Sequence, residues 1–337
     1  MYAVFLLSVA ECFPAVCAPE ADMANKLYFC YGVAVPLCYL YSCGRPPRIK
    51  NKFICYTIRH LPFLPAYGYI YLKKRPSEIM NTPDCAILGM GYLGKALAEK
   101  LFEQGSRVAA VKKTLTSDDI NLPVELNIAD LNDPNIFQTA FWQKWADKPV
   151  WICLLPPSSA EHYAPMLRQW LALAVQYGVR HVIYSSSTGV YGDKARACNE
   201  QSITDPQTGS ARKVLEAEQV FLNSGIPNID ILRFGGLYSA DRHPLNSLLK
   251  RSGIAGAEQP VNMVHKDFAV AALHDAVCTP GGVRIRNIIE PRHPSKREFY
   301  RAEALKLGLP EPDYDPTDTK GGKTVDTAYD DFAHIFV

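Results

Sequence analysis

The chain has 337 residues, of which 36 are basic and 34 acidic, giving a formal net charge of +2. Apolar residues make up 48% and charged residues 21%, which is ordinary globular usage and excludes a disordered, collagen-like or low-complexity chain. The small net charge gives no reason to expect nucleic acid as a partner. The average conceals a division near Met80. Residues 1–79 carry nine basic and four acidic residues and six of the ten cysteines, so the later part is net acidic.

Three interpretations compete for residues 1–79. Leu27–Gly44 is uncharged and precedes a basic stretch, as in a membrane anchor with a positive-inside flank, but Pro36 interrupts it. Met1–Ala10 lacks the positive charge that begins a signal peptide. The segment has no sustained hydrophobic period and no C-x-x-C pair. We therefore expect an N-terminal extension outside the fold, produced by a start site set too far upstream, with a weak anchor as the alternative.

Four cysteines follow this segment at wide spacings, as in a reduced cytosolic enzyme, and none belongs to a metal-binding pattern. They are Cys85, Cys153, Cys198 and Cys278. We accordingly expect a cytoplasmic protein that binds no metal ion and does not insert into a membrane.

A folded domain is predicted to begin at Met80. Cys85–Leu88 is a short apolar run typical of a buried strand, and Gly89-Met90-Gly91-Tyr92-Leu93-Gly94 follows it directly. Apolar residues then recur at helical spacing up to Leu101, and Arg107–Val111 predicts a second strand. The order strand, G-x-G-x-x-G, helix, strand is the context that a dinucleotide-binding fingerprint requires.

Each glycine of this fingerprint has a physical task. The first permits a tight turn, the second lets the backbone approach a pyrophosphate, and the third allows the helix to pack closely on the strand. The helix N-terminus supplies unpaired N–H groups and a positive dipole end for the phosphates. The predicted cofactor contacts in this loop are Gly89, Gly91, Tyr92, Leu93 and Gly94.

The end of the second strand bears on which dinucleotide binds. An NAD site usually places an acid here to hold the ribose 2′-hydroxyl, whereas this chain has Lys112 and Lys113 and no acid until Asp118. Two cations suit a 2′-phosphate, so we predict NADP as the cofactor, with NAD as the alternative. Asp130, after a predicted third strand, is placed to reach the adenine, and Pro156, after a fourth strand over Val150–Leu155, is a further cofactor contact.

The most specific stretch of the chain is Val182–Asp193, an apolar strand followed by S-S-S-x-x-V-Y-G. Together with the glycine fingerprint, it resembles the extended short-chain dehydrogenase/reductases, the group of NAD-dependent epimerases and dehydratases, over roughly residues 83–330. The resemblance implies an α/β fold with a doubly wound parallel sheet. It also implies that Ser187 is catalytic, because the third serine of this motif hydrogen-bonds the substrate oxygen.

The resemblance fails at one place that matters for chemistry. These enzymes carry a Y-x-x-x-K pair on the next helix, in which the tyrosine passes a proton and the lysine lowers the pKa of that tyrosine. When the register is set on Ala217-Glu218, the two places fall on Ser210 and Val214. Atypical members of the family keep the glycine loop and the serine motif and lose this pair in the same way.

Later segments agree with the resemblance. Ile229–Tyr238 resembles the family's L-R-x-x-x-x-Y element, and Val261–Asp267 resembles its I-H-x-x-D element with the acid one place early. His265 either contacts the substrate or is a hydrogen-bonded structural histidine. Ser295-x-x-Glu298 is a capping box that predicts a helix ending at Gly308.

These patterns predict a Rossmann-type NADP-binding domain over residues 80–235 and a small, partly interleaved substrate lobe over 236–337. The expected function is an NAD(P)-dependent oxidoreductase or epimerase that acts on a small-molecule substrate, and a homodimer is consistent with the resemblance. The alternative is a sensor or scaffold that binds NADP(H) without turnover. A third possibility is a membrane-tethered reductase, which would require residues 27–44 to act as the anchor.

Overall fold

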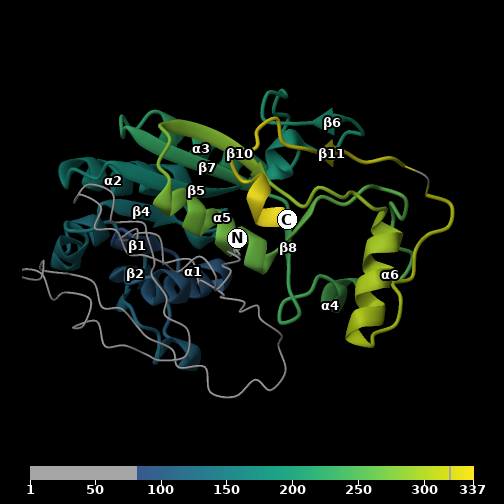
Figure 1. The fold of residues 1–337 in the computed structure, drawn as a ribbon, viewed down its shortest axis with the longest axis horizontal. Helices are drawn as coiled ribbons and strands as arrows, with labels where there is room; N and C mark the ends of the chain where they lie inside the picture. Colours follow the sequence, from purple (N-terminus) through teal and green to yellow (C-terminus); the bar gives the residue numbers. More distant parts are fainter. Residues whose placement is uncertain (1–81, 319) are drawn as a thin grey trace, which may run out of the picture. The chain divides into compact units, whose positions relative to one another are not determined.

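The computed structural model describes residues 82–318 and 320–337. The predictions for residues 1–79 lie outside this range. The centre of the fold is a seven-stranded parallel sheet with the strand order β10-β7-β5-β4-β1-β2-β3 (Figure 1). Its strands are β1 (Cys85–Leu88), β2 (Val108–Lys112), β3 (Glu125–Ile128), β4 (Val150–Cys153), β5 (His181–Ser187), β7 (Asn228–Phe234) and β10 (Val283–Ile288).

The strand order explains where a ligand can bind. The chain builds β1, β2 and β3 outward in one direction, then returns to place β4 against the other side of β1. This reversal creates a crevice beyond the carboxyl ends of β1 and β4, the position at which open α/β sheets bind ligands. The predicted doubly wound α/β fold is therefore confirmed.

Helices cover both faces of the sheet (Figure 1). One face carries α2 (Tyr163–Gln176) and α3 (Gly209–Leu222), and the other carries α1 (Tyr92–Glu103) and α5 (Lys266–Cys278). Alternate residues of β1, β2 and β4 enter the two cores, which is why these strands are apolar along almost their whole length.

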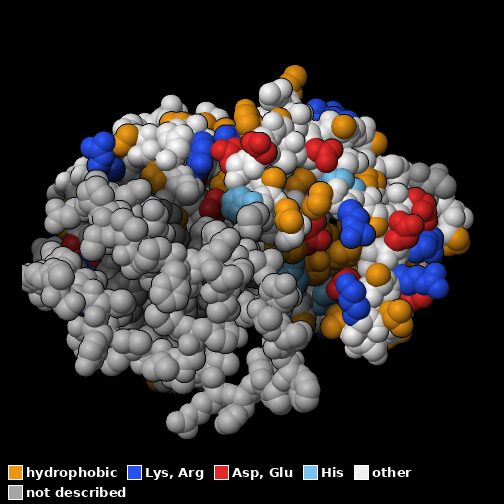
Figure 2. Space-filling view, viewed as in Figure 1, with side chains coloured by type: hydrophobic (Ala, Val, Ile, Leu, Met, Phe, Trp, Pro, Cys, Tyr) orange, Lys and Arg blue, Asp and Glu red, His pale blue; other side chains and the backbone are white. Residues whose placement is uncertain are grey.

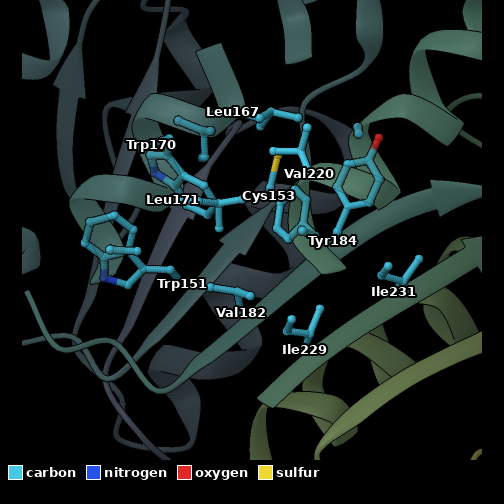
Figure 3. Packing of buried hydrophobic residues seen from close by; sticks show 14 of the residues in the cluster. Trp151, Cys153, Leu167, Trp170, Leu171, Val182, Tyr184, Val220, Ile229 and Ile231 are labelled. Atoms are coloured by element: carbon cyan, nitrogen blue, oxygen red, sulfur yellow. The ribbon is translucent and has the colours of Figure 1, made fainter. Parts of the chain in front are cut away.

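The core beneath α2 and α3 is rich in aromatic side chains. Trp151 of β4 packs against Trp170 of α2 with ring centroids 5.3 Å apart (Figure 3). Tyr184 of β5 stacks on Phe221 of α3 with centroids 4.7 Å apart. All four rings are fully buried. Buried aromatic rings of this size dominate core energetics, so this face anchors β4 and β5, the strands that lead to the candidate site.

The remaining elements lie beyond the carboxyl end of the sheet. They comprise the strand pair β8 (Gly236–Tyr238) and β9 (Met263–His265), the pair β6 (Ala197–Cys198) and β11 (Thr324–Val325), and the helices α4 (Leu245–Leu248) and α6 (Lys296–Leu307). The capping box is confirmed, because Ser295 and Glu298 cap α6 reciprocally and Gly308 ends it in the left-handed conformation. Basic and acidic side chains are interspersed on the surface around α6 (Figure 2).

Most predicted elements occur within a few residues of their expected positions. The strand β10 was not predicted, because its sequence, V-R-I-R-N-I, places Arg284 and Arg286 between its apolar residues. Arg284 donates to Asp230 on β7 at 2.7 Å, and Arg286 donates to Asp331 at 2.5 Å, so partners distant in sequence neutralise both cations. Within the described residues, no helix combines the length and apolar character that a membrane crossing requires.

Candidate functional site

The glycine-rich loop joins β1 to α1 at the reversal of strand order. Gly89 has a positive φ of 107°, and a Cβ atom there would lie 3.1 Å from the backbone of Leu154 and Leu155. A Cβ atom on Gly94 would lie inside van der Waals contact of the Gly89 carbonyl oxygen. Gly91 differs, because a Cβ atom there would meet nothing within 4 Å. The first and third glycines thus serve packing, and the second borders open space.

The N-terminus of α1 faces this open space. Gly91 is its N-cap and provides no side-chain hydrogen bond, and the first turn, which includes Tyr92 and Leu93, contains no acidic residue. The first N–H groups of a helix have no acceptor within the helix, and the dipole places positive potential there. The loop therefore has the vacant donors and the sign of charge that a pyrophosphate requires.

The lysines at the end of β2 are held in a compact ionic cluster. Asp119, whose side chain is fully buried, accepts from Lys112 at 2.5 Å and pairs with Lys95 of α1 at 3.0 Å. Thr116 also donates to this carboxylate through its backbone N–H and its hydroxyl. Burial favours a raised pKa for Asp119, but these hydrogen bonds prevail and hold its pKa well below the usual value. Lys95 also lies 3.7 Å from the exposed Asp118, so the two lysines of the cluster face one buried and one exposed carboxylate.

The other two predicted contacts, Asp130 and Pro156, follow β3 and β4. Lys113 is largely exposed and pairs with Asp130 at 2.8 Å, so this carboxylate turns toward the lysine and toward Asn132. Pro156 begins the short 3-10 helix Pro157–Ser159 after β4, close to the contact between Gly89 and Leu155. The fold thus brings the ends of β1, β2, β3 and β4 to one edge of the sheet.

Ser187 is the last residue of β5 and caps the 3-10 helix η8 (Thr188–Tyr191). Its Oγ accepts a hydrogen bond from the Gly189 N–H at 3.1 Å, and the side chain is half-buried. A serine hydroxyl that accepts in this way still has its own proton to donate. No acceptor for that proton occurs among the described residues, so the hydroxyl is able to bind a substrate oxygen.

The residues around Ser187 form a buried polar network that fixes its strand. Glu218 of α3 makes a bidentate ion pair with Arg233 of β7 at 2.6 and 2.8 Å and accepts from the Ser186 hydroxyl at 2.5 Å. Arg233 also donates to the Tyr191 hydroxyl, which donates to Asn287 of β10. The A-E and L-R motifs of the sequence are therefore two halves of one ion pair.

The structure places neither a phenol nor an ammonium at the two positions where the resemblance leads us to expect them. Ser210 is exposed in the first turn of α3, and Val214 is buried in the core. Two nearby tyrosines are committed elsewhere. Burial raises the pKa of Tyr184, whose hydroxyl accepts from Tyr163, and also that of Tyr191 within the ionic network.

Lys323 reaches the same region from the C-terminal part of the chain. Its Nζ donates to the carbonyl oxygen of Thr188, the first residue of η8, at 2.9 Å, and to that of Gly192, its C-cap, at 2.5 Å. Burial lowers the pKa of this ammonium. Lys323 therefore holds both ends of the turn that follows Ser187.

His265 occupies the N-cap of α5. Its Nδ1 accepts from the Asp267 N–H at 3.3 Å, and its ring packs edge-on against Tyr238 with centroids 5.1 Å apart. This arrangement gives His265 a structural task as a helix cap, while about a third of its side chain stays exposed.

Several residues of the site were not singled out from the sequence. Lys95 directly follows the glycine fingerprint and Lys323 follows two glycines, and both positions offered a weak local signal. Asp119 offered none, because its importance arises only from contacts that the fold creates.

Comparison with known proteins confirms the resemblance. Residues 85–225, from β1 to just beyond α3, match the NAD dependent epimerase/dehydratase family. The chain is also similar to Protein YeeZ of Escherichia coli strain K12, with 29% identity over 257 residues that cover 72% of this chain and 90% of that protein.

Several solved structures share the fold. MoeE5, in complex with UDP-glucose and NAD, superposes with a TM-score of 0.60 at 20% identity, covering 73% of this chain and 90% of its own. UDP-glucuronic acid 4-epimerase from Bacillus cereus, in complex with NAD, gives a TM-score of 0.59 at 18% identity with the same coverage.

Proposed function

We propose that this chain, which has the fold and the sequence match of the NAD-dependent epimerase/dehydratase family, is an NADP(H)-dependent oxidoreductase or epimerase acting on a small-molecule hydroxyl or carbonyl compound. The observation that carries the proposal is the combination of an open glycine loop at Gly91 with a free hydroxyl proton on Ser187. The glycine loop belongs to β1 and Ser187 to β5, with only β4 between them. Adjacent strands lie about 4.8 Å apart, so the two features are within the span of one dinucleotide and its substrate.

The residues present fit a dinucleotide. The first turn of α1 would hold the pyrophosphate, since Gly91 leaves room for phosphate oxygens to approach the backbone. The bound nicotinamide would supply or accept a hydride. The Ser187 hydroxyl would donate a hydrogen bond to the substrate oxygen and stabilise the negative charge that develops there.

The preference for NADP rests on the ionic cluster at the end of β2. Asp119 is buried and paired with Lys95, Lys112 and Thr116, so it is poorly placed to accept from a ribose 2′-hydroxyl. Lys113 is exposed and able to turn from Asp130 toward a 2′-phosphate. A site with two lysines at its rim and a buried carboxylate favours the phosphate-bearing cofactor.

The proton donor for a reduced carbonyl is a water molecule or a nonstandard group. Tyr184 and Tyr191 are buried and hydrogen-bonded within the protein. Lys323 donates to two carbonyl oxygens and lies beneath the turn rather than on α3. We propose that slow turnover accompanies this loss of the usual tyrosine.

The test is a cofactor-dependent screen of the purified full chain. Carbonyl compounds and nucleotide sugars would be offered with NADPH or NADP, since a solved relative of the same fold binds UDP-glucose. Ser187→Ala should lower kcat for any active substrate by roughly 100-fold while cofactor affinity stays unchanged. Ser252→Ala, which alters an exposed serine in a loop far along the chain, serves as the control. Unchanged activity in Ser187→Ala would refute the role of this serine.

A sensor or scaffold that binds NADP(H) without turnover is the second candidate. It is favoured by the exposed Ser210 and the buried Val214 at the positions of the usual proton-transfer pair. Tight NADPH binding with no turnover over the whole panel would support the sensor and contradict the enzyme.

A further inference from the structure

Tyr92, the first residue of α1, is the meeting point of three distant parts of the chain. Its hydroxyl is hydrogen-bonded to Ser239, which follows β8 and itself donates to Asp241 at 2.5 Å. The Arg242 guanidinium lies 4.9 Å from the centre of the Tyr92 ring. The Lys266 ammonium, at the start of α5, lies 5.1 Å from the same ring. Two cations are thus held beside the glycine-rich loop.

The charges around this ring do not cancel. Asp241 faces Lys266 at 3.3 Å and is the only acidic residue that contacts the pair within the described part of the chain. Arg242 is exposed, and no described carboxylate forms an ion pair with it. The group therefore keeps one net positive charge, next to a helix N-terminus that has neither a side-chain cap nor an acid in its first turn. Positive charge of this kind, concentrated beside open space, is suited to an anion.

We propose that Arg242 and Lys266 bind the pyrophosphate of the dinucleotide from the side opposite to the glycine loop, with Tyr92 as the platform that holds them. The inference rests on the proposed function and deepens it. A guanidinium over an aromatic ring is attracted to the face of that ring and keeps its N–H donors for an anion. The edge donors of Arg242 and the ammonium of Lys266 then add to the backbone N–H groups of α1.

Position favours the pyrophosphate over other anions. Tyr92 directly follows Gly91, the glycine whose missing side chain opens the space in front of the helix. The 2′-phosphate of NADP would instead lie at the end of β2, near Lys112. The two groups of cations therefore have separate tasks. Arg242 and Lys266 should affect every dinucleotide alike, whereas Lys112 and Lys113 should distinguish NADP from NAD.

The test titrates the full chain with NADPH, NADH and ADP-ribose and measures the binding by calorimetry. Arg242→Ala and Lys266→Ala should each weaken the binding of all three by roughly tenfold, leaving the ratio of NADPH to NADH affinity unchanged. Arg242→Lys should weaken binding less than Arg242→Ala does, because lysine keeps the positive charge and loses only the planar fork of donors. Lys250→Ala removes an exposed cation elsewhere in the same lobe and should bind as the wild type does.

The outcomes separate this inference from the proposed function. If the wild type binds dinucleotides and the Arg242 and Lys266 variants bind them equally well, the inference is wrong and the proposed function stands. If the variants raise only the KM for the second substrate, the cations recognise that substrate and the inference is again wrong. If the wild type binds none of the three ligands, the proposed function itself fails. Thermal unfolding of each variant, expected within a few degrees of the wild type, excludes misfolding as the cause.

Discussion

The glycine loop offers a substitution whose effects on folding and on binding should separate cleanly. Gly91→Ala adds a methyl group where the structure has nothing within 4 Å, and the φ of −94° lies outside the left-handed region that favours glycine. Replacing glycine by alanine at an N-cap costs at most about 1 kcal/mol of stability. For a fold of this size, that corresponds to a fall in Tm of about 2–4 °C.

The same methyl group should strongly weaken dinucleotide binding. A phosphate oxygen must approach a backbone nitrogen to about 2.9 Å, whereas a methyl carbon keeps it about 3.5 Å away. Loss of one charge-assisted hydrogen bond, about 1.5–3 kcal/mol, corresponds to a roughly 10- to 150-fold weaker Kd. Titration with NADPH by fluorescence, paired with thermal unfolding, measures both effects.

Gly94→Ala provides the contrast, because its Cβ would collide with the Gly89 carbonyl oxygen and should destabilise the fold itself. If Gly91→Ala bound NADPH as tightly as the wild type, the loop would not be the phosphate site. If it instead unfolded as Gly94→Ala should, the space in front of α1 would not be open, and the reasoning from the glycines would fail.

Two further predictions concern buried charges. Glu218→Gln should lower the free energy of unfolding by about 3–5 kcal/mol in a denaturant titration, because it leaves the Arg233 guanidinium buried without its counter-charge. Glu216→Gln, on the exposed side of the same helix, should change it by less than about 0.5 kcal/mol, and equal effects would contradict the assigned network. Asp119→Asn should raise the affinity for NADPH relative to NADH roughly fivefold, the equivalent of about 1 kcal/mol between charges 4 Å apart in water. In the wild type, the free energy of unfolding should fall as the pH drops below about 4, because Asp119 takes up a proton in the unfolded chain and stays ionised in the folded one. Asp119→Asn should lack this contribution to the fall. Asp133→Asn, at an exposed carboxylate outside the lysine cluster, is the control, and an unchanged cofactor ratio in Asp119→Asn would count against the lysine cluster.

Local sequence patterns were sufficient for the first half of the fold. The glycines from Gly89 to Gly94 fix a turn, a helix start and a helix–strand contact, so β1, α1 and β2 could be placed within one or two residues. The same holds for α6, whose capping box and Gly308 are both local signals. In each case the physical cause lies within a few residues of the element that it determines.

The features that the sequence did not predict depend on contacts between residues far apart in the chain. The strand β10 contains two arginines whose partners, Asp230 and Asp331, are about fifty residues away, so its sequence lacks the apolar run of a buried strand. Lys112 was visible as a candidate, but its burial against Asp119 depends on how residues 114–119 fold back. Arg242 meets Tyr92 only because the segment after β8 returns to the glycine loop, a contact that spans 150 residues.

The central claim is that this chain binds NADP(H) in the glycine loop, at the reversal of strand order. A titration of the purified full chain with NADPH and with NADH, at matched ionic strength, tests it most directly. We expect saturable binding of both at one site per chain, with the tighter Kd for NADPH. Absence of saturable binding for both dinucleotides would contradict the claim.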